Sequence, residues 1–179
     1  MAKWILESDH SSASFAVRHM MVTWVRGIFT KVSGTLVFDP LNVAASAVEV
    51  EIAAASLFTG VAKRDQHLKS ADFLDTDKYP SITFKSTRVE PVALDHAWVY
   101  GDLTIRGVSR PVVLDAHWSG PAFFQDEGTL YTSYGFRGKT MINREDFGMT
   151  WNTAMAHGGV MVGRQVYLRV DSEADLVED

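Results

Sequence analysis

The segment DQHLKSADFLDTDKYPSITFKS, from Asp65 to Ser86, decides the fold of this chain, because it joins a polar, helix-like run to a β-strand through one Tyr79-Pro80 corner. Two further blocks follow it along the chain. They read GDLTIRGVSRPV from Gly101 to Val112 and GFRGKTMINREDFGM from Gly135 to Met149. Each later block also joins a strand-like run to a turn that contains Gly or Pro.

These three blocks resemble the signature blocks of the YceI-like family, and the resemblance extends from Asp9 to the final predicted strand, over nearly the whole chain and in the expected order. Members of that family are lipocalin-like β-barrels that bind polyisoprenoid or other long-chain lipids in their interior. The resemblance therefore implies a barrel with an apolar ligand. It also implies a homodimer. The His10-Ser11 pair near the N-terminus fits the resemblance, because a His-Ser pair is common at this point in the family.

The composition is that of one ordinary globular domain, which we expect to span residues 1–179. The chain has 46% hydrophobic and 22% charged residues, enough to bury a substantial core. The formal net charge is -5 and the basic residues are scattered, which argues against a nucleic-acid partner. The absence of cysteine excludes disulfides, thiolate metal sites and a cysteine nucleophile.

The N-terminal residues do not form a secretory signal, because Glu7 and Asp9 interrupt the chain before any apolar run develops. We therefore expect a cytoplasmic protein, or a periplasmic one if a leader was removed, since many relatives in the family carry an export signal. No stretch approaches the roughly 18 consecutive apolar residues that span a bilayer.

A two-residue hydrophobic period runs through most of the chain and is clearest from Gln165 to Asp175. This period is typical of half-buried strands. Turn-forming residues such as Asp39-Pro40, Arg106-Gly107 and Gly120-Pro121 separate the strands. The predicted strands are 12–18, 32–38, 48–52, 81–89, 97–106, 112–118, 129–143 and 165–175.

The period changes between Leu57 and Leu74, where Val61, Leu68 and Ala71 are too widely spaced for a strand. We expect a short helical insert here, with Thr59 as its N-cap, lying across one mouth of a barrel. Closure of an antiparallel sheet removes its two unpaired edges. The predicted fold is therefore all-β: a closed, antiparallel, eight-stranded, lipocalin-like barrel with this insert.

A barrel of eight strands has an interior that either is filled by side chains or holds one slender ligand. Small residues with inward parity, such as Gly34, Gly101 and Ser172, favour the second alternative. The side chains with inward parity that we expect to line the cavity are Phe15, Val17, Val32, Leu36, Phe38, Val50, Phe84, Leu103, Ile105, Leu114, Phe136 and Leu168.

A polar head group of the ligand would remain at the barrel mouth. Cationic and imidazole side chains are suitable neighbours for a phosphate, quinone or carboxylate. The candidates in this sequence are Arg18, His19, Arg64, His67 and Lys69.

No catalytic, cofactor or metal site is predicted. Asp9, His10 and Ser11 are adjacent on a strand and point to alternate faces, so they cannot align as a triad. No two of the six histidines show the spacing of a ready chelate, i to i+4 on a helix or i to i+2 on a strand. Arg144 and Asp146 are expected to form an ion pair that holds a turn.

The favoured function is non-catalytic binding, carriage or storage of a long-chain apolar ligand such as a polyisoprenoid, an isoprenoid quinone or a fatty-acid-like lipid. Two alternatives stay open at this point. One is an enzyme that acts on an apolar substrate in the same cavity, and the other is a structural or stress-response module whose barrel is filled by its own side chains.

Overall fold

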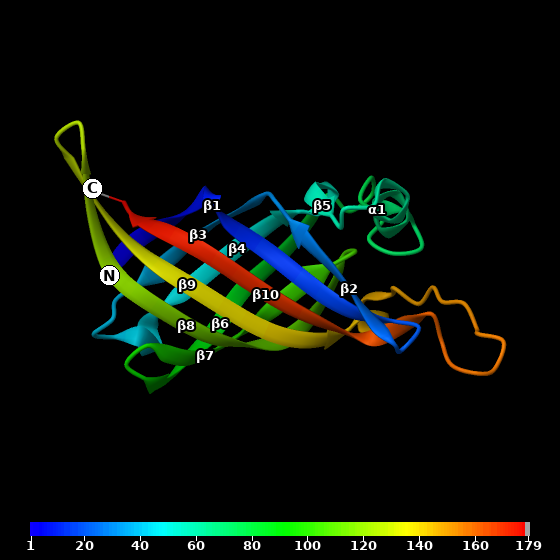
Figure 1. Cartoon of the computed structure of the whole chain (residues 1–179). Coiled ribbons are helices and arrows are strands. Elements are labelled where there is room, and N and C mark those ends of the chain that lie inside the picture. The colour runs from blue at the N-terminus through cyan, green and yellow to red at the C-terminus, as the bar shows by residue number, and fades with distance from the viewer. Residues whose placement is uncertain (178–179) are drawn as a thin grey trace.

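The strands form one antiparallel sheet that curves into a barrel, so that the first strand along the chain pairs with the last (Figure 1). The computed structural model describes residues 1–177, so the predicted domain 1–179 extends two residues beyond the described part. Within it, eight strands close the barrel in the order β1, β10, β9, β8, β7, β6, β4, β3 and back to β1. Their bounds are β1 Ala2–His19, β3 Val32–Phe38, β4 Ala47–Ala53, β6 Ser81–Ala93, β7 His96–Ile105, β8 Val108–Asp126, β9 Thr129–Asn143 and β10 Val162–Leu176.

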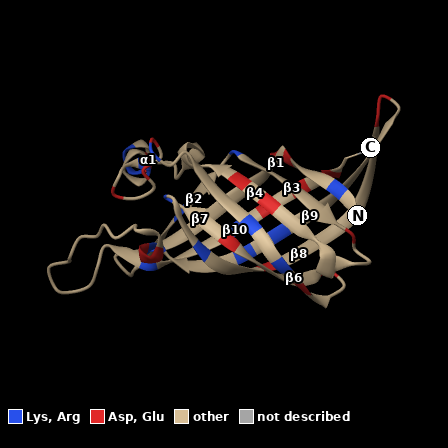
Figure 2. Cartoon of the chain, turned by 180° about the vertical axis from the view of Figure 1, so that it is seen from behind, with Lys and Arg blue, Asp and Glu red and all other residues tan. Residues whose placement is uncertain are grey.

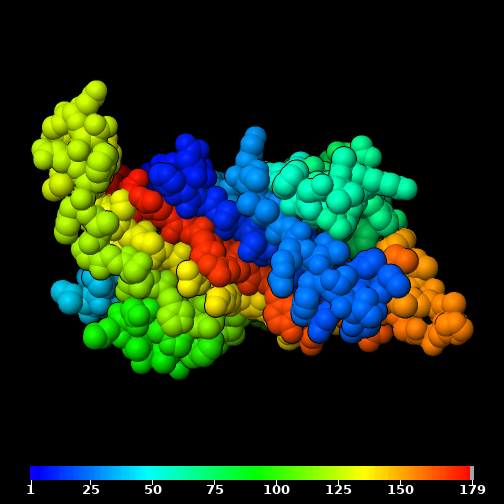
Figure 3. Space-filling model, viewed as in Figure 1, coloured from blue at the N-terminus to red at the C-terminus, as the bar shows by residue number. Residues whose placement is uncertain are grey.

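The seam of the barrel is the antiparallel pairing of β1 with β10, which runs from Trp4 opposite Leu176 to His19 opposite Val162. The two strands lie side by side across the front of the molecule (Figure 3). On its other edge, β1 pairs with β3 through residues 2–5 and with β2 (Thr23–Phe29) through residues 13–19. The long strand β1 therefore takes part both in the closed ring and in the β1–β2 hairpin.

The eight predicted strands are the eight strands of this ring, which confirms the predicted fold class. Two short additions were missed, namely β2 and β5 (Leu57–Phe58), which pair with each other outside the ring. The predicted break at Gly120-Pro121 is wrong, because β8 continues through it to Asp126. A register shift between Ser119 and Ala122 accommodates the proline, as β-bulges commonly do.

The helical insert lies at one end of the barrel, as predicted (Figure 1). It consists of α1 (Ala62–Lys69), preceded by the short 3₁₀ helix Ala54–Ser56 and followed by turns. The expectation that Thr59 caps the helix is wrong, because Val61 is the N-cap residue and makes no capping bond with its side chain. Thr59 instead donates from its backbone N–H and its hydroxyl to Asp65 Oδ1, at 3.0 and 2.5 Å. No helix among residues 1–177 has the length and apolarity needed to cross a membrane.

Alternate residues of the strands point into the barrel and form its apolar core. On β7, for example, Ala97, Val99, Gly101 and Leu103 are buried, whereas Trp98 and Asp102 between them are exposed. Positions of both charges are scattered along the strands (Figure 2). The alternation read from the sequence therefore corresponds to an apolar interior and a charged exterior.

The three sequence blocks meet at the α1 end. A Cβ on Gly107, in the β7–β8 turn, would lie 2.9 Å from the ring of Tyr79, so the corner of the first block packs on the turn of the second. Arg106 in that turn donates to the Gly148 carbonyl of the third block at 3.0 Å. The Arg144 guanidinium of the third block lies 5.9 Å from the ring centre of Phe73 in the first.

Arg144 is 2% exposed and belongs to the 3₁₀ helix Arg144–Phe147. Its guanidinium donates to four backbone carbonyls, those of Gly163 (2.8 Å), Met149, Trp151 (3.0 Å) and Val162 (3.2 Å). The predicted ion pair with Asp146 is not among the ion pairs of the described chain. Burial lowers the pKa of Arg144 from its ordinary value. The carbonyl dipoles compensate the buried charge, so Arg144 holds both ends of the loop between β9 and β10.

Replacement of Arg144 by Met should lower the free energy of unfolding by about 3 kcal/mol or more, because several buried carbonyls lose their donor. Urea unfolding followed by tryptophan fluorescence measures this loss. Arg164→Met is the matched control, since the Arg164 side chain is 71% exposed and pairs with Glu145 at 3.3 Å on the surface. The control should change the free energy by less than about 0.5 kcal/mol. Equal losses in both variants would contradict the role assigned to Arg144.

Candidate functional site in the barrel interior

The barrel encloses a cavity of about 250 Å³ whose wall is almost entirely apolar. Side chains from all eight ring strands contribute to this wall, together with Leu68, Phe73 and Leu74 from α1 and the turn after it. The interior is therefore not filled throughout by its own side chains. An apolar space of this kind disfavours polar ligands and favours hydrocarbon.

Eleven of the twelve side chains predicted to line the cavity lie on its wall. Val32 is the one that does not, because it is packed in the core with only 1% exposure. Its inward parity was read correctly, but tight packing against neighbours removes it from the surface of the cavity. The eleven that lie on the wall are Phe15, Val17, Leu36, Phe38, Val50, Phe84, Leu103, Ile105, Leu114, Phe136 and Leu168. Their contact with a ligand stays a prediction.

Two glycines on the inner face do not leave empty space, because phenylalanine rings cover them. A Cβ on Gly27 would collide with the ring of Phe15, its partner across the β1–β2 pair. A Cβ on Gly101 would collide with the ring of Phe84. The expectation that Gly101 makes room is therefore wrong, and these glycines instead let two large rings lie flat against the wall. Ser172 does lie on the cavity wall.

The end of the barrel away from α1 is closed by an aromatic cluster. Phe38 packs edge-to-face against Trp118, Tyr134 and Phe136, with ring centres 5.2 to 5.5 Å apart. Trp4 joins the cluster and donates from its indole N–H to the Phe38 carbonyl at 3.1 Å. Edge-to-face contacts among buried rings fix their orientation, so this end of the cavity is rigid.

The α1 end is closed by a different kind of contact, between α1 and the loop that precedes β10. The ring of His67 packs edge-to-face on Trp151, with ring centres 4.6 Å apart, and on Phe73 at 5.0 Å. Its Nε2 also contacts Asp72 Oδ2 at 2.8 Å. His67 therefore joins the helix to the loop at this mouth.

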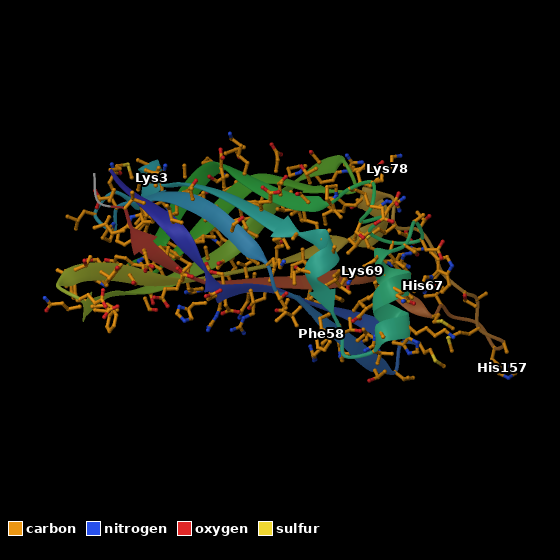
Figure 4. All side chains as sticks on the ribbon, turned by 90° about the horizontal axis from the view of Figure 1, so that it is seen from above. Lys3, Phe58, His67, Lys69, Lys78 and His157 are labelled. Carbon is orange, nitrogen blue, oxygen red and sulfur yellow. The ribbon has the colours of Figure 1, made fainter. Side chains whose placement is uncertain are left out.

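The five predicted head-group residues belong to β1 and α1, and none of them is on the cavity wall of the described chain. Arg18 stacks on Trp24, 4.4 Å from its ring centre, and Arg64 donates to the hydroxyl and carbonyl of Thr59. His67 and Lys69 lie together near Phe58 at the α1 end, whereas Lys3 lies at the opposite end (Figure 4). His19 ends β1. Their role as neighbours of a head group stays a prediction.

One residue of the cavity wall has a buried hydroxyl without a hydrogen-bond partner among the described residues. Ser46 follows the 3₁₀ helix Val43–Ala45, and its Oγ is buried without a hydrogen-bond partner in the structure. Arg144 also reaches the wall, but its donors are directed to backbone carbonyls. Sequence reasoning missed Ser46, because nothing in a lone serine before a strand signals an unpaired buried hydroxyl.

Several apolar wall residues were also missed. Ile82 and Val99 share the inward parity of Phe84 and Leu103, so the two-residue period could have found them. Leu68 and Phe73 could not be found in this way, because they reach the cavity from α1 and the turn after it.

Asp9, His10 and Ser11 do not form a catalytic arrangement. His10 Nδ1 lies 3.4 Å from Glu173 on β10, and the Asp9 backbone N–H bonds to Glu7. The Ser11 hydroxyl is buried without a partner. These residues coincide with a register shift of β1 between Glu7 and Ser12, so they shape the seam of the barrel.

Comparison with known proteins gives a consistent result. A family model described as the YceI-like domain matches residues 4–174. A UPF0312 protein of Vibrio cholerae is 40% identical over 140 residues, which are 78% of this chain and 72% of that protein. The crystal structure of a YceI protein from Campylobacter jejuni superposes with a TM-score of 0.72 at 31% identity and covers 90% of each chain.

A polyisoprenoid binding domain from Saccharophagus degradans has the same fold, with a TM-score of 0.68 at 13% identity, over 99% of this chain and 100% of that one. The family model and the 40% identical relative carry the assignment, since they rest on sequence over most of the chain. The closed eight-stranded ring agrees with it. The chain therefore belongs to the YceI-like family.

Proposed function

We propose that this protein binds a slender apolar molecule inside its barrel, without chemical conversion, and thereby shields it from water. The observation that carries the proposal is the interior cavity of about 250 Å³ with an almost wholly apolar wall. The polyisoprenoid binding domain of Saccharophagus degradans has the same fold, which supports a ligand of this class. An isoprenoid, isoprenoid quinone or fatty-acid-like chain fits that description.

The energy available is sufficient for useful affinity. Removal of one CH₂ group from water contributes about 0.8 kcal/mol, so about ten groups contribute roughly 8 kcal/mol. That corresponds to a dissociation constant on the order of 1 μM before the costs of ordering the ligand. No hydrogen bond or ion pair to the ligand is required for this binding.

The volume of the cavity limits the ligand. Pockets for drug-sized ligands range from about 300 to 1,000 Å³, and this cavity is slightly below that range. A chain of moderate length fits the space as it stands. A longer isoprenoid would have to leave the barrel at the α1 end, because the aromatic cluster closes the other end.

An enzyme acting in the same cavity is the weaker alternative. Among residues 1–177, the wall carries no carboxylate, and its titratable side chains are His117, Arg137, Arg144 and Arg169. Its one buried ionic group, Arg144, donates to the backbone. The homodimer implied by the family resemblance concerns the outer face and stays a prediction.

The direct test is extraction of the purified protein with organic solvent, followed by mass spectrometry of the extract. We expect close to one equivalent of a long-chain apolar molecule per chain. Protein that was unfolded in denaturant, washed with detergent and refolded is the control, and it should take up an added isoprenoid or fatty acid to the same ratio. Failure of both the native and the refolded protein to hold any apolar molecule would overturn the proposal.

Gly138→Leu should fill the cavity and abolish retention of the ligand. Gly138 lies on the wall, and a Cβ there would meet Leu114 at 3.5 Å, an ordinary contact, so a larger side chain has room to enter the cavity. Met141→Leu on the outer face of the same strand is the control, since Met141 is 48% exposed. Both variants should fold with unchanged far-ultraviolet circular dichroism. Retention of the ligand by a folded Gly138→Leu variant would place the ligand elsewhere.

Ser46→Ala tests where a polar end group of the ligand lies. If the free hydroxyl of Ser46 contacts that group, the variant should bind a fluorescent fatty acid about fivefold more weakly, because one hydrogen bond is worth about 1 kcal/mol. The same probe without its carboxyl group should bind wild type and variant equally. A fatty-acid affinity that does not change would favour the α1 end, where Arg18, Arg64 and Lys69 are located.

A further inference from the structure

A cluster of three potential metal ligands lies on the outer face of β7 and β8. His96 is directly opposite His117 in the β7–β8 pair, and Asp115 is two residues before His117 on β8. Asp115 Oδ1 lies 2.8 Å from His96 Nε2 and 3.3 Å from His117 Nε2. The two imidazole rings stack in parallel, with centres 4.3 Å apart. One ligand atom from each residue thus lies within 4.8 Å of the other two.

The strand geometry explains why these groups converge. Residues i and i+2 of a strand point to the same face, and directly opposite residues of an antiparallel pair have Cβ atoms about 5 Å apart. The neighbours Ala97, Leu114 and Ala116 have the other parity and line the cavity. The cluster is therefore held by the barrel wall, and it lies near the β6–β7 turn, at the end opposite α1 (Figure 1).

The spacing suits a tetrahedral ion. Zinc binds imidazole nitrogen and carboxylate oxygen at about 2.0 to 2.2 Å, so two ligand atoms of a tetrahedral site are separated by roughly 3.3 Å. The 3.3 Å between Asp115 and His117 equals this value, whereas the 2.8 Å between Asp115 and His96 has to lengthen by about 0.5 Å. The His117 side chain is 46% exposed, so it has room to rotate toward a shared ion.

The surroundings order the cluster without competing for it. The His96 side chain is 20% exposed, and Trp98 packs edge-to-face on its ring at 5.3 Å. Arg137 is the partner of His117 on β9, but its guanidinium is directed at Asp171 at 3.0 Å. Lys139 is the partner of Asp115, and no ion pair between the two is found in the described chain. The carboxylate is thus shared by the two imidazoles alone.

We propose that His96, Asp115 and His117 form a binding site for a divalent transition-metal ion such as Zn²⁺. Three protein ligands leave at least one coordination position open to water or to a ligand from outside. Two imidazoles and one carboxylate suit zinc, copper and nickel better than magnesium or calcium, which prefer sites made of oxygen ligands. Of the three residues, His117 also borders the cavity, whereas His96 and Asp115 do not. The proposal does not depend on the proposed lipid function.

Isothermal titration of tag-free protein with Zn²⁺ tests the site. Wild type should bind one equivalent, and the ion should raise the melting temperature because it binds the folded chain. Mg²⁺ should give neither effect. Three variants remove one ligand each: His96→Gln, His117→Gln and Asp115→Asn. Removing a residue that only supports a metal ligand typically weakens binding 10- to 100-fold. Each of the three variants should weaken Zn²⁺ binding by more than that.

His157→Gln is the matched control, because His157 lies at the tip of the loop before β10, far from the cluster (Figure 4). It should bind Zn²⁺ as wild type does. Circular dichroism must show that the three cluster variants fold. The proposal is overturned if wild type takes up no Zn²⁺, or if the folded cluster variants bind it as tightly as wild type. Binding lost only in His157→Gln would also overturn it.

Discussion

The pairing of β1 with β10 is the interaction on which the rest of the structure depends. A sheet of this length would otherwise expose two edges and a broad apolar face, and the cavity exists only because the edges join. Closure also requires β1 to change partners, from β3 along residues 2–5 to β2 along residues 13–19. The register shift between Glu7 and Ser12 falls between these two segments, so the least regular part of β1 is where the strand passes from one partner to the other.

The two ends of the barrel are closed by different means, and this difference gives the molecule a direction. The end near Trp4 and Phe38 is sealed by buried rings in edge-to-face contact, which a ligand could pass only by disrupting the core. The other end is covered by α1 and by the loop that Arg144 holds through backbone carbonyls. Local opening of a loop costs less than disruption of a core. Entry of an apolar chain is therefore expected at the α1 end.

The ring strands and their inward-facing positions could be predicted because a half-buried strand has a two-residue hydrophobic period in its sequence, as in Gln165 to Asp175. The short strands β2 and β5 were not predicted, since Leu57–Phe58 is too short to show a period. The wall residue Leu68 and the ligands of the proposed metal site were not predicted either, because their positions depend on contacts between segments far apart in the sequence. His96 and His117 are 21 positions apart, and only the register of β7 against β8 brings them together. Asp115 and His117 do have the i to i+2 spacing of a strand chelate, but this pair joins a carboxylate to an imidazole and contains only one histidine.

Successive side chains of each strand point alternately into and out of the barrel, so ligand binding in the cavity and metal binding on the outer face can depend on different residues. Along β8, Leu114 and Ala116 contribute to the apolar wall, whereas Asp115 between them does not. His117 belongs to the proposed metal site and also borders the cavity. A substitution of Asp115 therefore changes the outer surface without changing the cavity wall, and the reverse holds for Leu114. Loss of lipid retention and loss of metal binding should be separable by single substitutions at these two neighbouring positions. Coupling between them would require a shift of the β7–β8 register, which the inward packing of Val99 and Leu114 opposes.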